Sequence, residues 1–401
     1  MKILITTECY MPTINGVVTS VMNLRNELLK HGHEVRILTL SETKHSYEKD
    51  GAVYIGSVGA GKIYPGARLT LTRENSYIEK LINWKPDVIH SQSEFSTFLI
   101  ARHIANRLQI PIVHTYHTVY ENYTHYFSPV KAWGKAMTAF LTNKVLKYTQ
   151  CVIAPTEKVS SLLTGYGVEQ EIKVVPTGID LTRFNIPIQL SIKKLLKEKI
   201  GIPNNNKVLV SVGRLAKEKN LEEILLYLSQ LNRKNLTLLI VGDGPNHKSL
   251  EQYAKELDIA DQVIFTGMIS PHDIGSYYQL GDVFVSASNS ETQGLTYIEA
   301  LANGVPTICR KDPCLENVVK NGVNGWQYET FEQFQDELYF TISRDNDDLR
   351  KNAIESAYKD FSSDIFAKKI EHIYQDTISA YKKIYRIKTL SVLDYVDVVK
   401  H

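Results

Sequence analysis

Two glutamates, Glu291 and Glu299, are separated by seven residues that include a glycine, in the segment E-T-Q-G-L-T-Y-I-E. This segment follows an apolar run over 282–287, and the glycine stands where a helix should begin. The first N–H groups of a helix have no partner within it, so those around residues 293–296 are candidate donors. We expect Glu291 to accept from sugar hydroxyls and Glu299 to accept from both hydroxyls of a ribose. The alternative is a helix-capping acid beside a surface acid.

Two cations follow another apolar run in the segment S-V-G-R-L-A-K-E-K-N, residues 211–220. Arg214 and Lys219 would stand at the carboxyl end of a strand, beside a new helix. A diphosphate leaving group gains negative charge as its bond breaks, and fixed cations in a dry site stabilise that charge. Because Lys217 lies between them, a solvated lysine-rich cap is the alternative.

Three glycine-containing turns complete the candidate set. Gly16, in N-G-V-V-T-S, would let backbone N–H groups at a helix start approach a phosphate, although the segment is not a G-x-G-x-x-G dinucleotide fingerprint. The segments V-G-D-G-P (241–245) and F-T-G-M-I (265–269) end two further strands. The second could present backbone near Met268 and Ile269 to a nucleobase. Ordinary turn chemistry explains each of the three about as well.

A histidine-rich and tyrosine-rich segment, H-T-V-Y-E-N-Y-T-H-Y, spans residues 117–126. His117 follows a strand candidate and could hydrogen-bond a sugar hydroxyl. Eight of the twelve histidines precede residue 130, so a histidine in this region is weak evidence by itself.

The elements that must position these residues alternate between short apolar strands and amphipathic helices, which predicts two α/β domains with parallel sheets. Residues 176–206 break the rhythm and predict the interdomain connection, and residues 345–388 are helical with no strand after them. Ligands bind beyond the carboxyl ends of parallel strands, so two such domains would face an interdomain cleft. The predicted strands are 3–7, 34–40, 87–91, 111–116, 151–154 and 172–175, then 208–212, 236–241, 262–266, 282–287 and 305–309.

Composition excludes several classes of protein. The 401 residues include 43% hydrophobic and 22% charged residues, as in globular enzymes, and the net charge of +2 gives no field that selects nucleic acid. The four cysteines form no C-x-x-C pair, which favours a reducing compartment over a disulfide or zinc framework. Because no apolar run approaches the length of a membrane span, we expect a cytoplasmic protein whose membrane contact is peripheral.

Taken in order, these motifs resemble the retaining glycosyltransferases of family 4, which have the GT-B fold. The resemblance runs from residue 1 to about residue 327 and rests on E-x7-E, G-R-x4-K, G-D-G-P, F-T-G and the N-terminal N-G-V-V-T-S. It implies an N-terminal acceptor-binding domain over 1–185 and a nucleotide-sugar-binding domain over 186–364, both Rossmann-like. It also implies that C-terminal helices over about 365–401 cross back to the first domain.

The resemblance also implies roles for individual residues. The cations would hold the diphosphate, Gly16 its distal phosphate and Glu299 the ribose. Glu291, His117 and the backbone of residues 293–296 would hold the sugar, and the base would lie near Met268 and Ile269. The residues implied in catalysis are Glu291, His117, Arg214 and Lys219. The donor-binding set is Gly16, Arg214, Lys219, Met268, Ile269, Glu291, Thr292, Gln293, Gly294, Leu295, Thr296 and Glu299.

A narrower likeness involves E-C-Y-M-P-T-I-N-G-V-V-T-S-V and H-T-V-Y-E-N-Y-T-H-Y, which resemble bacterial 1,2-diacylglycerol 3-α-glucosyltransferases. It implies glucose transfer from UDP-glucose to the 3-hydroxyl of diacylglycerol, giving a membrane glycolipid and lipoteichoic-acid anchor. The segment R-K-D-P-C-L-E (310–316) departs from the glycine pair of many relatives, which weakens the donor assignment. Addition of a second hexose, nucleotide-sugar epimerisation and a non-catalytic partner subunit remain as alternatives.

A lipid acceptor requires contact with a bilayer, and one stretch of the chain has the charge for it. Residues 122–156 contain no Asp or Glu but four lysines and six aromatic residues, which suits an anionic surface. Lys131 and Lys135 share one helical face, whereas Lys144 and Lys147 lie roughly opposite, so the lysines do not predict a clean interfacial helix. Solvated helix faces are the alternative. The candidates for acceptor or membrane contact are Tyr120, Tyr123, Tyr126, Lys131 and Lys135.

The resemblance implies same-face attack, in which the departing diphosphate takes the acceptor's proton. No cofactor beyond the UDP-sugar co-substrate is expected. The one D-x-D, at residues 345–347, stands in a polar segment far from the strand ends. We therefore predict no metal site, and expect Mg²⁺ to do no more than stimulate the reaction.

Overall fold

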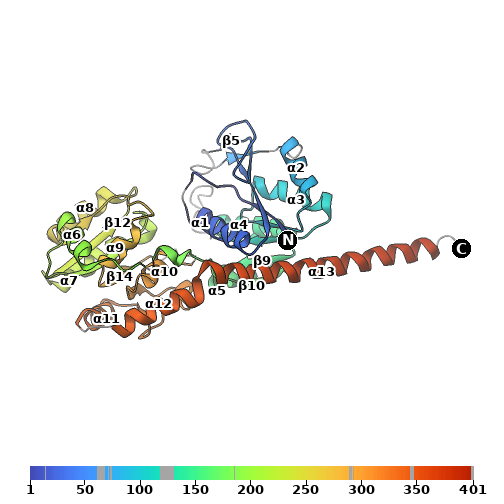
Figure 1. The fold of residues 1–401 in the computed structure, drawn as a ribbon. Coiled ribbons are helices and arrows are strands. Elements are labelled where there is room, and N and C mark those ends of the chain that lie inside the picture. The colour runs from blue at the N-terminus through green and yellow to red at the C-terminus, as the bar shows by residue number, and fades with distance from the viewer. Residues whose placement is uncertain are drawn as a thin grey trace. The chain divides into compact units, whose positions relative to one another are not determined.

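The computed structural model describes residues 1–13, 15–60, 68–70, 72, 75–117, 131–184, 186–288, 291, 293–343 and 347–398. It contains two compact units. The first combines residues 1–178 with the chain from Ser363 onward, and the second comprises residues 179–362 (Figure 1). Each unit has its own sheet and its own core, as the sequence predicts.

The sheet of the first unit has eight strands in the order β10-β9-β8-β7-β1-β2-β4-β3, and only the edge pair β3·β4 is antiparallel. The central strands are mostly apolar because both faces of the sheet are covered, whereas the edge strand β3 is charged and exposed. Their bounds are β1 Lys2–Thr6, β2 Glu34–Leu40, β3 Tyr47–Lys49, β4 Ala52–Ile55, β7 Val88–Ser91, β8 Ile112–Thr115, β9 Cys151–Ala154 and β10 Glu171–Val174; β5 (Val58–Gly59) and β6 (Arg68–Leu69) form a separate pair.

Alternate residues of β1 face two different cores, which shows that helices cover both faces of this sheet. Ile3 and Ile5 enter the core that lies under α1 and α13, and Leu4 enters the core under α2 and α3. The helices of the unit are α1 (Gly16–Lys30), α2 (Ser76–Trp84), α3 (Ser96–Leu108), α4 (Lys131–Leu146), α5 (Glu157–Gly165) and α13 (Ser363–Val398).

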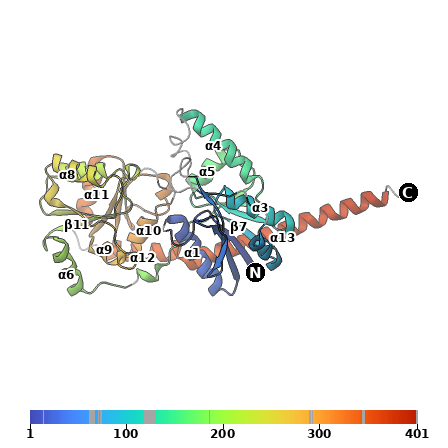
Figure 2. The ribbon, with the colours of Figure 1, turned by 90° about the horizontal axis from the view of Figure 1, so that it is seen from above.

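Helix α13 returns from the second unit and packs against α1 (Figures 1 and 2). Phe366, Ile370 and Tyr374 are buried in the core that α1 also lines. The hydroxyl of Tyr374 lies 2.7 Å from Nδ1 of His90, whose Nε2 lies 2.7 Å from Oγ1 of Thr115. Burial lowers the pKa of His90 well below its usual value, so the imidazole acts as a neutral link between the sheet and α13.

The sheet of the second unit is fully parallel, in the order β13-β12-β11-β14-β15-β16. Its strands are β11 Lys207–Val212, β12 Leu236–Val241, β13 Val263–Phe265, β14 Val283–Ser286, β15 Thr307–Arg310 and β16 Gly325–Tyr328. Its helices are α6 Leu190–Ile200, α7 Leu221–Leu231, α8 His247–Glu256, α9 Ile274–Leu280, α10 Leu295–Ala302, α11 Phe331–Ser343 and α12 Asp347–Phe361.

The chain passes between the units at two adjacent points. The N–H of Ile179 donates to the carbonyl of Phe361 at 2.8 Å, and Ile179 also forms a bridge with Ser362. These contacts set the unit boundaries at 178 and 362, whereas the sequence analysis placed them at 185 and 364.

Three features of the fold differ from the sequence analysis. The stretch 176–206 contains the helix α6, whose Leu196 and Ile200 pack on the core of the second unit, so it is more than a connection. Strand β16 was not predicted because Gly325–Tyr328 is short and polar in part. Strands β3 and β4 were also missed. The charged residues of β3 make it look like a loop, and it survives as the exposed edge of the sheet.

Candidate active site

Two loops of the second unit are held against each other by glycines. A Cβ on Gly242, after β12, would lie 2.0 Å from the carbonyl oxygen of Gly213, after β11, and Gly242 has a φ of +131°. The N–H of Gly242 also donates to the carbonyl of Gly267, after β13, at 3.0 Å. The carboxyl ends of three adjacent strands are therefore joined by backbone contacts that admit no side chain at this position.

This arrangement fixes the start of the segment that carries the predicted cations. Arg214 directly follows Gly213 and is exposed. Within the described part of the chain, its guanidinium group has no ion-pair partner. Lys219 ends a short 3₁₀ turn, Lys217–Lys219, and its ammonium group pairs with the carboxylate of Glu291. The structure thus brings Lys219 and Glu291 together and leaves Arg214 available to a ligand.

Helix α10 begins with backbone donors that no described side chain caps. Its N-cap, Gly294, adopts the left-handed conformation with a φ of +75°. A Cβ there would lie 2.8 Å from side-chain carbons of both Leu315 and Tyr297, so glycine is required. Gln293 is buried, while Leu295 and Thr296 are partly exposed. The first N–H groups of this helix can therefore bind an anionic or hydroxyl ligand.

Glu299 lies on the fifth residue of α10 and accepts a 2.7 Å hydrogen bond from the hydroxyl of Tyr278 on α9. Tyr278 is fully buried, and its ring packs edge-on against Phe184. Burial is the main cause that raises the pKa of Tyr278 well above its usual value, so the hydroxyl remains a donor. The Glu299 carboxylate is thereby oriented by a rigid partner that sequence reasoning did not identify.

The predicted base-binding residues follow β13. Met268 is 77% exposed, and Ile269 packs partly against the core. Gly267 has a φ of +69°, so the chain turns sharply just before them. They follow Gly267, whose carbonyl accepts from the N–H of Gly242 at 3.0 Å.

The unusual segment 310–316 has structural partners of its own. Nη1 of Arg310 lies 2.8 and 2.7 Å from the two carboxylate oxygens of Glu223 on α7, and Tyr328 donates to the same carboxylate at 2.9 Å. Asp312 accepts from the N–H of Cys314 at 2.8 Å and so begins the 3₁₀ turn Pro313–Leu315. Arg310 and Asp312 are thus committed to internal contacts.

In the first unit, His117 follows β8 and its Nε2 lies 2.7 Å from Oε1 of Gln92. Burial lowers the pKa of His117 to about 4, so the ring is neutral at physiological pH. With the amide oxygen of Gln92 as acceptor, the proton resides on Nε2, and Nδ1 is left as an acceptor. His117 can therefore receive a hydrogen bond from a hydroxyl group.

A partly buried acid in the first unit, Glu8, was missed in the sequence. Glu8 follows β1 and accepts from both the N–H (2.7 Å) and the hydroxyl (3.1 Å) of Thr97 at the start of α3. Burial raises the pKa of Glu8 to about 7. The neighbouring Glu94 lies 3.2 Å from Nε2 of His114. A single glutamate after a strand gives no periodic signal, so only its three-dimensional surroundings mark it.

Gly16 is the first residue of α1 and is exposed. The side chain of Asn15 already accepts from the N–H of Val18, so one N-terminal donor of this helix is occupied. The prediction that a phosphate binds at Gly16 therefore depends on the other N–H groups in the first turn of α1.

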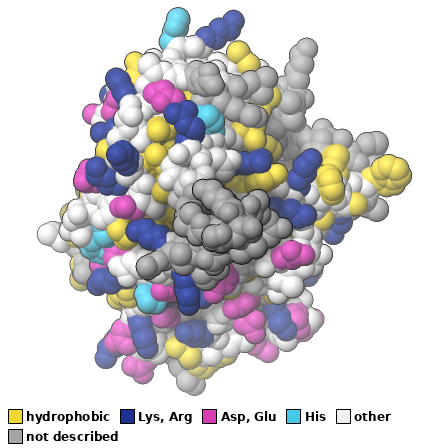
Figure 3. Space-filling model, turned by 90° about the vertical axis from the view of Figure 1, so that its right-hand side faces the viewer, with side chains coloured by type: hydrophobic (Ala, Val, Ile, Leu, Met, Phe, Trp, Pro, Cys, Tyr) yellow, Lys and Arg dark blue, Asp and Glu magenta, His cyan; other side chains and the backbone are white. Residues whose placement is uncertain are grey.

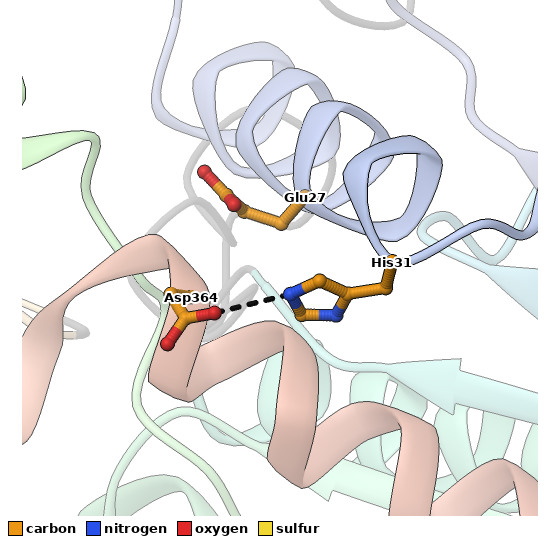
Figure 4. Close-up of side chains that lie close together, drawn as sticks. All are labelled: Glu27, His31 and Asp364. Atoms are coloured by element: carbon orange, nitrogen blue, oxygen red, sulfur yellow. Dashed lines mark hydrogen bonds and ion pairs between the residues drawn. The ribbon is translucent and has the colours of Figure 1, made fainter.

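At the other end of α1 there is a cluster of three side chains, Glu27, His31 and Asp364. Their oxygen and nitrogen atoms lie close enough together to hold a cation (Figure 4). His31 lies between Asp364, at 3.0 Å, and Glu371, at 2.5 Å, both on α13. The carboxylate of Asp364 also pairs with Lys368 at 2.7 Å, and that of Glu27 with Lys30 at 2.9 Å. These ion pairs already compensate the carboxylates, so the contacts assign the cluster to the joint between α1 and α13.

Several predicted residues lie outside the described part of the chain: Thr292, Tyr120, Tyr123 and Tyr126, with the first two residues of the D-x-D. Lys131 begins α4, and Lys135 is exposed one turn later.

Comparison with known proteins places this geometry in a family. The model described as "Glycosyltransferase Family 4" matches residues 14–183, and that described as "Glycosyl transferases group 1" matches residues 192–360. The alpha-monoglucosyldiacylglycerol synthase of Streptococcus pneumoniae is 35% identical over 94% of this chain and 86% of its own. The chain belongs to glycosyltransferase family 4. The enzyme of the same name from Acholeplasma laidlawii is 34% identical over 96% of this chain and 99% of its own.

Solved structures show the fold of this glycosyltransferase. Sucrose-phosphate synthase from Thermosynechococcus elongatus matches with a TM-score of 0.71 and 19% identity. The match covers 94% of this chain and 99% of the synthase chain. Anabaena HepE in complex with UDP and glucose matches with a TM-score of 0.68 and 18% identity. The match covers 94% of this chain and 100% of the HepE chain. The predicted GT-B fold, with α13 crossing back to the first unit, is confirmed. No helix in the described residues is both long and apolar enough to cross a membrane.

Proposed function

We propose that this glycosyltransferase moves glucose from UDP-glucose to the 3-hydroxyl of 1,2-diacylglycerol, with retention at the anomeric carbon. The observation that carries the proposal is the junction of Lys219 with Glu291, flanked by Arg214 and by the uncapped start of α10. In this proposal the cations and the first backbone donors of α10 together bind the diphosphate. The carboxylates at either end of the segment 291–299 suit the hydroxyls of the sugar and the ribose.

Retention is proposed from the resemblance to the retaining family, and the contacts of the acids bear only on how it occurs. A side-chain nucleophile would need a carboxylate placed at the anomeric carbon. Glu291 pairs with Lys219, and Glu299 accepts from Tyr278, so both carboxylates are oriented for binding. In the proposed reaction the acceptor hydroxyl attacks from the face that the diphosphate leaves. The C–O bond to the diphosphate breaks, the new C–O bond forms, and the diphosphate takes the acceptor's proton.

The roles of the chain's own groups then follow. Arg214, Lys219 and the first N–H groups of α10 stabilise the leaving diphosphate, and the backbone at Met268 and Ile269 contacts uracil. His117, neutral at physiological pH, accepts a hydrogen bond from a sugar hydroxyl and so orients the ring. Because the cations supply the positive charge, we propose that the reaction needs no metal and that Mg²⁺ acts only as a stimulant.

The acceptor and the setting rest on the relatives. Two proteins at 34–35% identity over nearly the whole chain are named alpha-monoglucosyldiacylglycerol synthases. We infer the same acceptor here, reached from the cytoplasmic face of the membrane, and a product that serves as a membrane glycolipid and as an anchor for lipoteichoic acid.

The test is product analysis with labelled UDP-glucose and vesicles that contain diacylglycerol. We expect one labelled lipid, whose anomeric proton coupling in NMR identifies an α-glucoside. A β-linked product would contradict retention. Label appearing only when monoglucosyl-diacylglycerol is supplied would favour addition of the second hexose. Conversion of the donor without any acceptor would favour an epimerase.

A further inference from the structure

The outer surface of α4 carries large apolar side chains that are exposed among the described residues. Trp133 is 78% exposed, Phe140 64%, Leu141 51% and Met137 43%. At about 100° per residue, these four side chains fall within one sector of roughly 100° on the helix. We call these four residues the α4 apolar face.

The opposite surface of α4 faces the protein and includes two buried threonines. Thr138 and Thr142 are each 5% exposed, and Leu146 is fully buried. A surface helix normally turns its apolar side chains inward and its hydroxyls outward. The inversion in α4 means that the apolar groups are placed for a partner outside this chain.

Positive charge surrounds the α4 apolar face. Lys144 and Lys147 are exposed on the same side of the helix, and Nζ of Lys144 lies 5.9 Å from the centroid of the Phe140 ring. Where the helix ends, Tyr148 is 40% exposed and stacks with the guanidinium of Arg102, 3.2 Å from its ring centroid. No Asp or Glu occurs between residues 122 and 156.

Figures 2 and 3 show the setting. Helix α4 projects from the first unit in Figure 2, and at the corresponding right-hand edge of Figure 3 hydrophobic side chains lie beside Lys and Arg side chains.

We propose that the α4 apolar face inserts into the surface of an anionic lipid bilayer. An exposed tryptophan, three further large apolar side chains and adjoining lysines without acids match an interfacial helix, whose apolar face enters the acyl boundary while lysines meet anionic headgroups. This inference rests on the proposed function, because an enzyme acting on diacylglycerol must reach a lipid that stays in the membrane. It names the surface that makes the contact.

The test compares two variants of the full chain in sedimentation with vesicles of phosphatidylglycerol and phosphatidylcholine that contain no diacylglycerol. The variant Phe140→Ser with Leu141→Ser removes two residues of the face. The control Leu190→Ser removes an 85% exposed leucine from the lysine-rich helix α6 of the second unit. We expect the double variant to lose vesicle affinity by about tenfold or more, since it loses apolar area at the boundary. The control should stay within about twofold of the wild type.

Unchanged vesicle binding by the double variant, or a larger loss in the control, would overturn the proposal. Thermal unfolding and UDP binding of both variants establish that each is folded. Because the vesicles contain no acceptor, this result does not depend on the reaction. A protein that binds vesicles through α4 but makes no glycolipid would contradict only the proposed function.

Trp133 provides a second readout. Insertion into the bilayer should shift the tryptophan emission of the wild type to shorter wavelength when vesicles are added, and Trp133→Phe should abolish the shift. Persistence of the shift in Trp133→Phe would contradict insertion of this face. If sedimentation without lipid shows that the double variant turns a dimer into a monomer while vesicle binding is unchanged, a second copy of the chain covers the face and the proposal fails.

Discussion

The ammonium group of Lys219 pairs with the carboxylate of Glu291, and this contact joins the loop after β11 to the loop before α10. The two side chains are only 31% and 12% exposed, so the pair is better shielded from water than a surface ion pair. It places Lys219 beside the start of α10 and leaves the guanidinium of Arg214 available. We interpret the pair as the element that prepares the second unit for a diphosphate.

Removing Arg214 should therefore affect the reaction far more than the fold. We expect Arg214→Ala to lower kcat by roughly 10²–10³, a few kcal/mol, as when one oriented donor to a developing charge is lost. The thermal midpoint should hardly change, because the side chain is exposed. Steady-state kinetics with UDP-glucose measure the effect, and Lys217→Ala is the matched control from the same exposed loop. Equal activity in the two variants would remove Arg214 from the site.

Glu299 should determine affinity for the nucleotide. Glu299→Gln removes the negative charge that would accept from two ribose hydroxyls, and we expect UDP to bind about 10 to 100 times more weakly. Calorimetric titration with UDP provides the number. Tyr278→Phe deletes only the hydroxyl that orients Glu299 and should have the smaller effect. An unaltered dissociation constant in Glu299→Gln would show that the ribose lies elsewhere.

The glycine contact between the strand ends yields a prediction about backbone geometry. In Gly242→Ala the new methyl group would lie 2.0 Å from the carbonyl oxygen of Gly213, so the two loops must separate and donor binding should be lost. Gly201→Ala is the control, because Gly201 also has a positive φ, +82°, but no atom within 4 Å of the added carbon. The control should cost about 1 kcal/mol of stability and leave UDP binding intact. Similar UDP affinities in both variants would contradict the account of these loops.

The joint between α1 and α13 should make stability depend on pH. Hydrogen bonding to Glu371, and secondarily to Asp364, raises the pKa of His31 above its usual 6.5. A group whose pKa is higher in the folded state than in the unfolded state stabilises the fold fully when the pH is below its unfolded-state pKa. This stabilisation is lost as the pH rises through its folded-state pKa. His31→Ala should thus lower the thermal midpoint more at pH 6 than at pH 9. The control is the corresponding variant His372→Ala, because His372 is exposed and its Nε2 lies 3.5 Å from a carboxylate oxygen of Asp376.

Two other groups change stability at lower pH. Hydrogen bonding to Lys368, and then to His31, lowers the pKa of Asp364, so its contribution is lost as pH falls through that value. The pKa of His117 is lowered to about 4, so the unfolded chain binds more protons there and stability falls from pH 6.5 towards 4.

For the joint between α1 and α13, a thermal midpoint of His31→Ala that differs from that of the wild type equally at pH 6 and pH 9 would show that the joint does not titrate.

The sequence predicts the parts of this fold that obey local rules. The strands at 34–40, 151–154 and 236–241 are confirmed to the residue because buried parallel strands are continuous apolar runs. The edge strand Tyr47–Lys49 was missed because its residues are exposed and mostly charged, although the two-residue turn Asp50-Gly51 that joins it to Ala52–Ile55 is a hairpin signal in the sequence.

Side-chain environments were harder to predict. Tyr278 and Glu8 gain their importance from burial and from partners distant in sequence, which no spacing rule reveals. For α4, the apolar residues at i, i+4, i+7 and i+8 were visible in the sequence, but the lysines alone argued against an interfacial helix. Only the fold shows that Thr138 and Thr142 face inward and that the apolar side is exposed.

The most direct test of the account is a crystal structure of the protein with UDP bound. We predict that the diphosphate oxygens lie within hydrogen-bond distance of the Arg214 guanidinium, the Lys219 ammonium and the first N–H groups of α10, and that the ribose hydroxyls contact Glu299. A nucleotide bound away from these groups, with the carboxylate of Glu299 facing solvent, would contradict it.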